Sequence, residues 1–223
     1  RVNAASLVAR MGTVTDVVGL VIRTQGPACS VGEICRITRR SDGGSVDCEV
    51  VGFHGSEVLL MPIGEIRGIS PGDQVRATGS PFTIPVGPEL LGRVLSAWGE
   101  PLDGGAAPAG LERVPVYRDA PAPMARRRIT ERLATGVRPI DGFLTLGAGQ
   151  RMGIFSGSGV GKSTLLSMIA RNTTAELSVI ALVGERGREV LDFIEKDLGP
   201  EGLKRSVVVV ATSEAPPLVR RQA

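Results

Sequence analysis

The sequence predicts a small all-β barrel followed by an α/β domain built on a parallel sheet. Between Gly12 and Ser80, short β-branched runs alternate with turns that contain glycine or proline. After Leu133, apolar runs alternate with segments of helical period, and a glycine-rich loop stands between the first such run and the first helix. We therefore expect a barrel domain in residues 1–81, an extended connection in 82–132 and a nucleotide-binding core in 133–223.

Five β-branched runs make up the expected barrel. They are TVTDVVGLVIRT, GEICRIT, SVDCEVVGF, SEVLLMPI and DQVRAT. The stretch SDGGS has the composition of a hairpin turn, and SPGD that of a second turn. Strands at this regular spacing are typical of a small barrel or sandwich.

The second half of the chain predicts a βαβαβ order. Its pieces are QRMGIFS as a strand, KSTLLSMIARN as a helix, LSVIALV as a strand, EVLDFIEKDLG as a helix and SVVVVAT as a strand. The continuous apolar run LSVIALV indicates a strand that is covered on both faces. We expect the second helix to end at Gly199-Pro200. A parallel sheet with right-handed crossovers follows from this order.

Composition excludes several classes of function. The net charge is +3 and only 3% of the residues are aromatic, so a general affinity for nucleic acid is not expected. The run Arg126–Arg128 then reads as a solvated basic loop. Three cysteines without a CxxC pair and a single histidine argue against a zinc site. No apolar stretch approaches the length of a membrane span, which favours a cytoplasmic chain.

The stretch SGSGVGKST has the pattern of a phosphate-binding loop from Gly161 onward and departs from it at Ser156, where a glycine is usual. Glycines allow the positive φ angles that wrapping a phosphate requires. Lys162 can reach the β- and γ-phosphates, and the hydroxyl of Ser163 can hold Mg²⁺. Serine is small, so we expect the loop to function. The expected nucleotide-binding residues are Gly157, Ser158, Gly159, Val160, Gly161, Lys162, Ser163 and Thr164.

A second motif, GERGRE, follows the strand LSVIALV. In a parallel sheet the carboxyl ends of the strands lie at one edge, so Glu185 is expected to face the glycine loop. Its carboxylate could orient an attacking water, and Arg186 could stabilise charge on the transferred group. We therefore expect Glu185, Lys162 and Arg186 to be catalytic. Taken alone, this turn is equally compatible with a solvent-exposed cluster of salt bridges.

Long segments resemble the ATPases of the rotary ATP synthase β-subunit superfamily, and among them the flagellum-specific protein export ATPases. They are LGRVLSAWGEPLDGG, ITERLATGVRPIDGFLTLGAGQRMGIF, GSGVGKSTLLSMIAR, ALVGERGREVLDFIEKDLGPEGLKRSVVVVATSE and PPLVRRQA. The resemblance implies a RecA-like domain in a homohexameric ring that hydrolyses ATP at subunit interfaces. It also implies that Lys162 and Ser163 hold phosphate and Mg²⁺, that Glu185 is the catalytic carboxylate with Arg186 near the γ-phosphate, and that Glu189 lies near the water shell of the metal.

By the pattern of this family the chain is an incomplete piece, because a metal-facing Asp, an arginine finger, an adenine pocket and a helical domain would follow Ala223. The resemblance further implies export-apparatus proteins, a regulator, a central-stalk-like subunit, export substrates and chaperones as partners, at the cytoplasmic side of the inner membrane export gate.

Three alternatives stay open. The first is an injectisome-type type III secretion ATPase, which shares every motif. The second is a non-catalytic nucleotide-binding subunit of a rotary ATPase, against which Glu185 argues. The third is a hexameric RNA translocase, against which the scarcity of aromatic residues argues.

Overall fold

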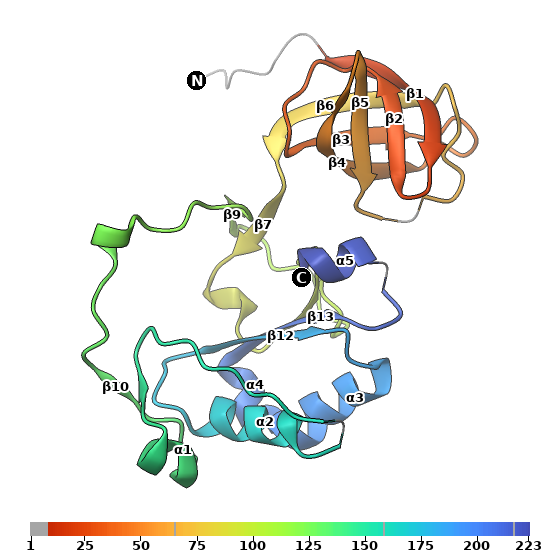
Figure 1. Ribbon diagram of the computed structural model, residues 1–223. Coiled ribbons are helices and arrows are strands. Elements are labelled where there is room, and N and C mark those ends of the chain that lie inside the picture. The colour runs from red at the N-terminus through yellow and green to blue at the C-terminus, as the bar shows by residue number, and fades with distance from the viewer. Residues whose placement is uncertain (1–8, 65, 158, 216) are drawn as a thin grey trace. The chain divides into compact units, whose positions relative to one another are not determined.

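The computed structural model describes residues 9–64, 66–157, 159–215 and 217–223. The chain forms two compact units (Figure 1). The first contains the chain up to Ile84 together with Val114–Tyr117, and the second contains Pro85–Arg113 and Arg118–Ala223.

The first unit is a closed antiparallel barrel, which confirms the prediction. Its strands follow the order β1-β2-β5-β4-β3-β6 around the barrel. Their bounds are β1 Met11–Val18, β2 Val21–Gln25, β3 Glu33–Thr38, β4 Ser45–His54, β5 Glu57–Pro62 and β6 Gln74–Pro81. The first predicted run is divided into β1 and β2 at Gly19, where φ is +62°. SDGGS lies in the hairpin between β3 and β4, as predicted.

Alternating side chains of the six strands fill the barrel. Ile22, Ile37, Val50, Leu60 and Val75 are fully buried there. Such alternation places one apolar face of each strand inward, so closing the sheet buries all of them together.

The three cysteines of the barrel are free thiols. Cys35 and Cys48 lie opposite each other on β3 and β4 and are fully buried, whereas Cys29 is half-buried. Burial raises the pKa of the Cys35 thiol to about 12. These side chains therefore pack as protonated thiols in the barrel core.

The segment between barrel and nucleotide core contains short elements of its own. They are β7 Thr83–Val86, η1 Pro88–Leu90, β8 Val94–Ser96, β9 Glu112–Pro115, η2 Pro123–Ala125, β10 Arg132–Leu133, α1 Arg138–Phe143 and β11 Leu146–Gly147. β7 pairs with β9, and β10 pairs with β11.

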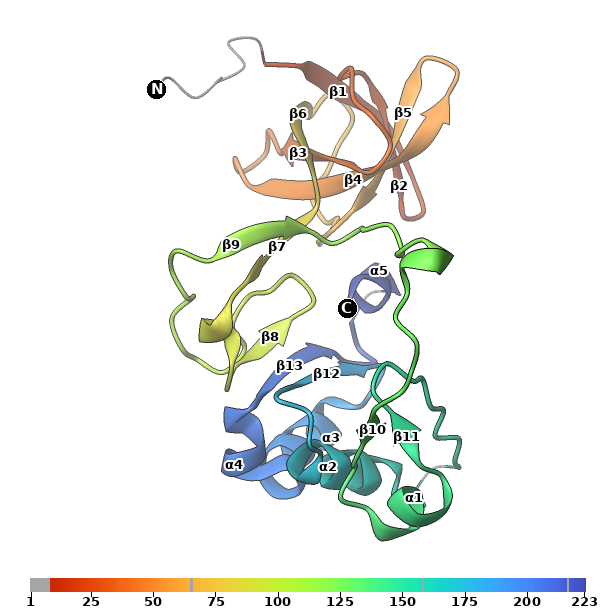
Figure 2. The same cartoon turned by 90° about the vertical axis from the view of Figure 1, so that its left-hand side faces the viewer.

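The second unit has a three-stranded parallel sheet of order β12-β13-β8, as predicted for the sheet type. Its other elements are α2 Lys162–Asn172, β12 Ser178–Val183, α3 Gly187–Asp192, the π-helical turn η3 Phe193–Leu198, α4 Gly199–Lys204, β13 Ser206–Ala211 and α5 Pro217–Gln222. The helices α2, α3 and α4 lie on one face of the sheet (Figure 2). None of the helices described is long and apolar enough to cross a bilayer.

Two predictions about the strands of this sheet are wrong. Residues 150–156, the predicted strand QRMGIFS, form no strand, and Phe155 is 96% exposed. β12 is not covered on both faces, because Leu182 is buried under the helices while Val179 on the other face is 69% exposed. Among the described strands, none pairs with the edge of β12 opposite β13. A strand needs a neighbouring strand for its backbone hydrogen bonds, and residues 150–156 pair with none of the described strands, so their hydrophobicity alone does not make them a strand.

The predicted helices form, but their buried faces differ from the expectation. In α2 the buried side chains are Ser167 and Ala170, and Met168 is 36% exposed. In the second helical segment Val190 and Leu198 are buried as expected, whereas Leu191 on α3 is exposed and Phe193, the first residue of the π-helical turn, is buried. Gly199, with φ of +67° and ψ of 172°, ends η3 as predicted, and the separate short helix α4 follows at once.

Candidate functional site

The glycine loop leads directly into α2. Gly161 is the N-cap residue, with φ of 95° and ψ of 19°, and no side chain caps this end of the helix. The first amide groups of a helix have no partner within it, and the helix dipole adds positive potential at the same place. The start of α2 therefore offers donors and a favourable field to an anion.

The far end of α2 is tied to a preceding turn. Thr174 donates its backbone N–H to the carbonyl of Ala134 at 3.0 Å, and the amide of Ala134 donates to the hydroxyl of Thr174 at 3.2 Å. Asp141 accepts hydrogen bonds from the amides of Thr135 and Gly136 at 2.8 and 3.0 Å. These bonds, the Thr135 amide foremost, lower the pKa of Asp141. The turn thereby holds α2 by its C-terminus.

Glu185 lies at the carboxyl end of β12, after Gly184. The carbonyl of Glu185 accepts the amide hydrogen of Ser213 at 2.9 Å, and the amide of Gly184 donates to Ala211 at 2.8 Å. Both partners lie at or just beyond the end of β13, so the two parallel strands fix the backbone of Glu185 at the sheet edge where ligands bind in such folds.

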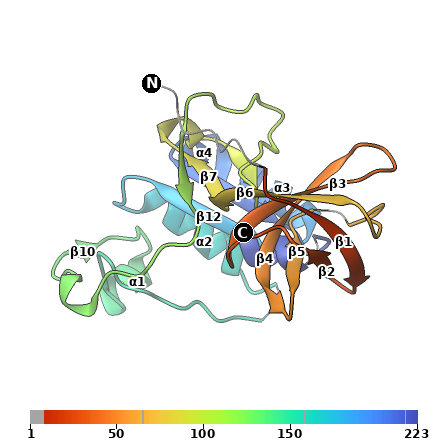
Figure 3. The same ribbon diagram turned by 90° about the horizontal axis from the view of Figure 1, so that it is seen from above.

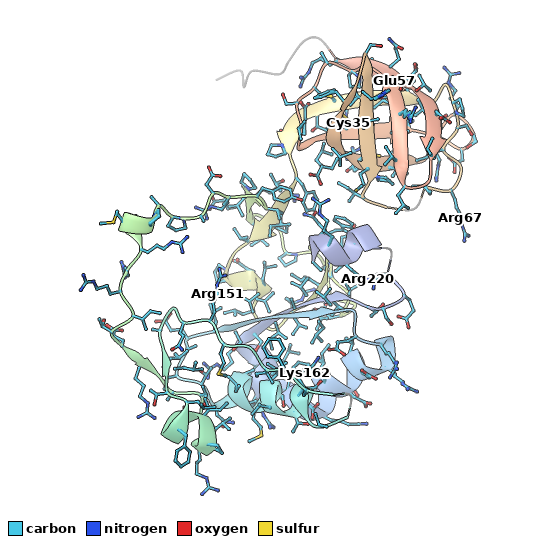
Figure 4. The ribbon with its side chains drawn as sticks, in the orientation of Figure 1. Cys35, Glu57, Arg67, Arg151, Lys162 and Arg220 are labelled. Carbon is cyan, nitrogen blue, oxygen red and sulfur yellow. The ribbon has the colours of Figure 1, made fainter. Side chains whose placement is uncertain are left out.

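Lys162 and Glu185 meet across this edge. Nζ of Lys162, the first residue of α2 (Figure 4), donates to Oε1 of Glu185 at 3.2 Å, and the two side chains are 43% and 30% exposed. An ion pair this open to solvent contributes about 0–1 kcal/mol. It is therefore weak enough for a polyphosphate to displace.

A hollow of about 540 Å³ surrounds this pair. Its lining residues are Ser156, Gly157, Gly159, Gly161, Lys162, Ser163, Thr164, Glu185, Glu189, Asp192 and Asp197. The volume lies within the range of ordinary small-molecule sites. The structure thus gathers most of the residues predicted for the site around one cavity, although they come from three separate parts of the chain.

Three of the expected residues differ from the prediction. Val160 does not line the hollow and is 67% exposed. Arg186 does not line it either, and its guanidinium pairs with Glu189 at 2.9 Å. Gly157 does not take a positive φ, unlike Gly159 and Gly161. Ser158 lies outside the described residues.

Ser156, the departure from the usual pattern, lies at the hollow with the described residues of the loop. Its hydroxyl donates to the carbonyl of Gly157 at 3.2 Å, and the residue lines the hollow. A serine is therefore accommodated at the position where the usual pattern has glycine.

Two lining carboxylates were missed at the sequence level. Asp192 stands three residues after Glu189 on α3, a spacing that could have revealed it because such residues share one helical face. Asp197 lies within the π-helical turn η3, whose changed helical phase cannot be predicted from the sequence pattern. With Glu185 and Glu189 they give the hollow four carboxylates beside one lysine.

The donors suit a metal that is held chiefly by its nucleotide. Within the described residues, no group of three or more His, Cys, Asp or Glu side chains could hold a metal ion by itself. Mg²⁺, however, needs only one or two protein oxygens when phosphates and water supply the rest. Ser163 and Glu189 both line the hollow and fit that limited part.

Two family models match the chain. Residues 14–79 match the beta-barrel domain of the ATP synthase alpha/beta family, and residues 136–223 match its nucleotide-binding domain. The chain belongs to the ATP synthase alpha/beta family. The two family models match in the same order along the chain as the barrel and the second unit of the structure.

Relatives in the ATP synthase alpha/beta family include flagellar and secretion proteins. The flagellum-specific ATP synthase of Bacillus subtilis is 55% identical over 96% of this chain and 49% of its own length, and that of Treponema pallidum is 54% identical over 94% and 47%. The type 3 secretion system ATPase of Xanthomonas euvesicatoria is 50% identical over 96% and 48%. The chain spans about half the length of the curated relatives it matches.

A solved structure supports the fold. The assembled ATPase EscN from the type III secretion system of enteropathogenic E. coli, in complex with its central stalk EscO, matches with a TM-score of 0.84 and 38% identity. The match covers 95% of this chain and 51% of that one. It agrees with a barrel followed by a nucleotide-binding domain.

Proposed function

We propose that the chain belongs to an ATPase that powers flagellar, type III protein export as a subunit of a hexameric ring. The observation that carries this is the meeting of Lys162 and Glu185 in one hollow at the start of α2. A phosphate-binding lysine beside a carboxylate at the same sheet edge is the arrangement that nucleotide hydrolysis requires.

In the proposed reaction the phosphates of ATP bind to the amides at the start of α2 and draw Nζ of Lys162 away from Glu185. The freed carboxylate then orients a water and accepts its proton as the water oxygen bonds to the γ-phosphorus, while the bond from that phosphorus to the bridging oxygen breaks and ADP leaves. Arg186 must leave Glu189 to approach the transferred group. Mg²⁺, bound through Ser163 with Glu189 near its water shell, would neutralise phosphate charge.

The retained Glu185 and the relatives favour a catalytic flagellar subunit. A non-catalytic nucleotide-binding subunit would not need this carboxylate opposite Lys162. The flagellar relatives reach 55% and 54% identity, against 50% for the first of the type 3 secretion ATPases. An injectisome-type secretion ATPase is the second candidate, because such proteins also match along nearly the whole chain.

Partners follow from the same proposal. The solved complex of EscN with its central stalk EscO supports a stalk-like subunit in the middle of a ring. We further propose a regulator, export-apparatus proteins, export substrates and chaperones as partners, and a cytoplasmic position peripheral to the inner membrane export gate. A nucleic acid is not among the proposed ligands, since single-strand binders stack bases on aromatic side chains that are rare here.

The test is Mg²⁺-dependent release of phosphate from ATP by the full-length protein, measured with and without Lys162→Ala. Hydrolysis that is absent from the variant supports the proposal, because a charge-assisted contact to phosphate is lost. Hydrolysis that is unchanged in the variant contradicts it. Adding single-stranded RNA provides the control, and stimulation by RNA would instead favour a translocase.

A further inference from the structure

A strongly basic segment runs along one side of the second unit. This basic arm, residues 118–132, carries five arginines and two carboxylates, a net charge of +3. Nearly all of its residues are exposed, and Met124 within it is 96% exposed. In the described part of the chain, Arg127 and Arg128 make neither an ion pair nor a hydrogen bond through their side chains. The arm therefore presents charge that its own unit does not neutralise.

The arm also borders a depression. Arg126, Arg127 and Arg128 line a hollow of about 740 Å³ together with Ala148 and Gly149 of the following loop. Arg126 donates from Nε to the carbonyl of Pro121 at 3.2 Å, which leaves its terminal nitrogens available. A concave basic surface of this size fits an acidic segment of polypeptide.

An equal and opposite charge lies elsewhere on the same unit. The acidic face, residues 185–201, carries six carboxylates and three basic side chains, a net charge of −3. It comprises the Glu185 turn, α3, η3 and the start of α4. Glu195 on η3 is exposed and has no hydrogen-bond or ion-pair partner within the described part of the chain. Four of the six carboxylates line the nucleotide hollow, namely Glu185, Glu189, Asp192 and Asp197.

The two surfaces lie on opposite sides of the second unit. In Figure 1 the arm descends on one side through η2 toward β10, and α3 lies at the other. Figure 3, seen from above, separates β10 and α3 in the same way. Because both surfaces belong to one compact unit that separates them, they do not neutralise each other in this structure.

We propose that the basic arm of one copy of this protein docks on the acidic face of the next copy. The inference rests on the proposed function and names the contact by which its subunits associate. Two different, complementary patches make a head-to-tail contact, which closes into a ring when the rotation between copies permits. Since the acidic face borders the nucleotide hollow, a docked arm places arginines at the mouth of the neighbour's site.

A second copy suits the arm better than a nucleic acid does. The arm contains no aromatic side chain on which bases could stack. The acidic face supplies the complementary charge in equal amount, and complementary potentials both steer association and fix the orientation of the partners. Nucleic-acid binding is kept as an outcome of the test.

The experiment reverses charge in the full-length protein and measures self-association by sedimentation velocity over a range of concentrations. Arg127→Glu with Arg128→Glu is expected to raise the apparent dissociation constant at least about tenfold. Arg127→Lys with Arg128→Lys keeps the charge and should assemble. Arg40→Glu with Arg76→Glu, two exposed positions of the barrel, gives a matched change of net charge and should also assemble.

Rescue locates the partner surface. Adding Glu195→Lys and Glu201→Lys to the reversed arm is expected to restore association, and assembly of the unmodified protein should weaken as salt rises. Full assembly of the reversed arm, or no rescue, overturns the proposal. So does binding of single-stranded RNA that depends on the arm while assembly does not.

Nucleotide binding is measured separately, as fluorescence of a labelled ADP on each variant. The arm variant is expected to bind labelled ADP as a single copy while failing to assemble. If no variant binds the nucleotide but association still depends on the arm, the proposed function fails and the docking contact stands.

Discussion

Changing Glu185 to Gln removes one negative charge 3.2 Å from Nζ of Lys162 and leaves the size of the side chain almost unchanged. In the wild-type protein the ion pair holds the lysine until phosphate arrives, and the carboxylate repels the phosphate as well. An amide does neither. The substitution therefore separates the binding of nucleotide from its hydrolysis.

The size of each effect follows from the structure. The two side chains are 43% and 30% exposed, so their pairing contributes about 1 kcal/mol at most. Losing that competition should tighten nucleotide binding up to about fivefold. Hydrolysis loses the group that orients and deprotonates the water, for which a decrease of about 10²–10⁴-fold is typical.

The assays are isothermal titration with Mg·ADP and phosphate release from ATP, both on the full-length protein. Glu176→Gln is the matched control, because it removes the same charge from an exposed position that lies outside both the hollow and the acidic face. The reasoning is refuted if Glu185→Gln binds nucleotide more weakly than the wild type. It is refuted equally if the variant keeps most of its turnover.

Three further outcomes are expected. Lys162→Ala should raise the dissociation constant of Mg·ADP at least about tenfold in titration, because a hydrogen bond to a charged group typically contributes about 1.5–3 kcal/mol. Gly161→Ala should also weaken the binding of Mg·ADP, since a φ of 95° strains an alanine by about 1–2 kcal/mol. Gly157→Ala should leave the binding unchanged, because Gly157 has no positive φ and an added Cβ would meet no atom within 4 Å. Hydrogen bonds from Arg93 lower the pKa of Asp103 in the folded protein. The ionised carboxylate therefore stabilises the fold above about pH 4, and this contribution is lost as the pH falls further. Asp103→Asn should lower the melting temperature at pH 7, and the difference in melting temperature from the wild type should shrink toward pH 2.

The sequence predicted the barrel well because its signals are local. β-branched runs alternate in period two, and glycine turns separate them, so each strand of the barrel is specified by its own residues and their neighbours. The glycine loop was equally predictable up to the start of α2, because the geometry of a helix N-terminus is set within a few residues.

The errors arose where structure depends on distant partners. The run 150–156 is apolar enough for a buried strand, yet pairing depends on a neighbouring strand and not on composition. The prediction that the strand LSVIALV is covered on both faces also relied on composition, and Val179 on the face away from the helices is exposed. Asp197 was missed because a π-helical turn shifts the helical phase, which shows how one irregular residue step can move a side chain into a site.

The position of the phosphate loop is therefore set from the helix side. With residues 150–156 outside any strand, the firm attachments are those of α2, whose buried Ala170 packs in one core with strand residues and whose C-terminus is held by the turn at Ala134 and Asp141. Glu185 is held independently, through the ends of β12 and β13. The weak ion pair between Lys162 and Glu185 spans these two anchors, so a bound polyphosphate can open the pair by moving side chains while both backbones stay in place.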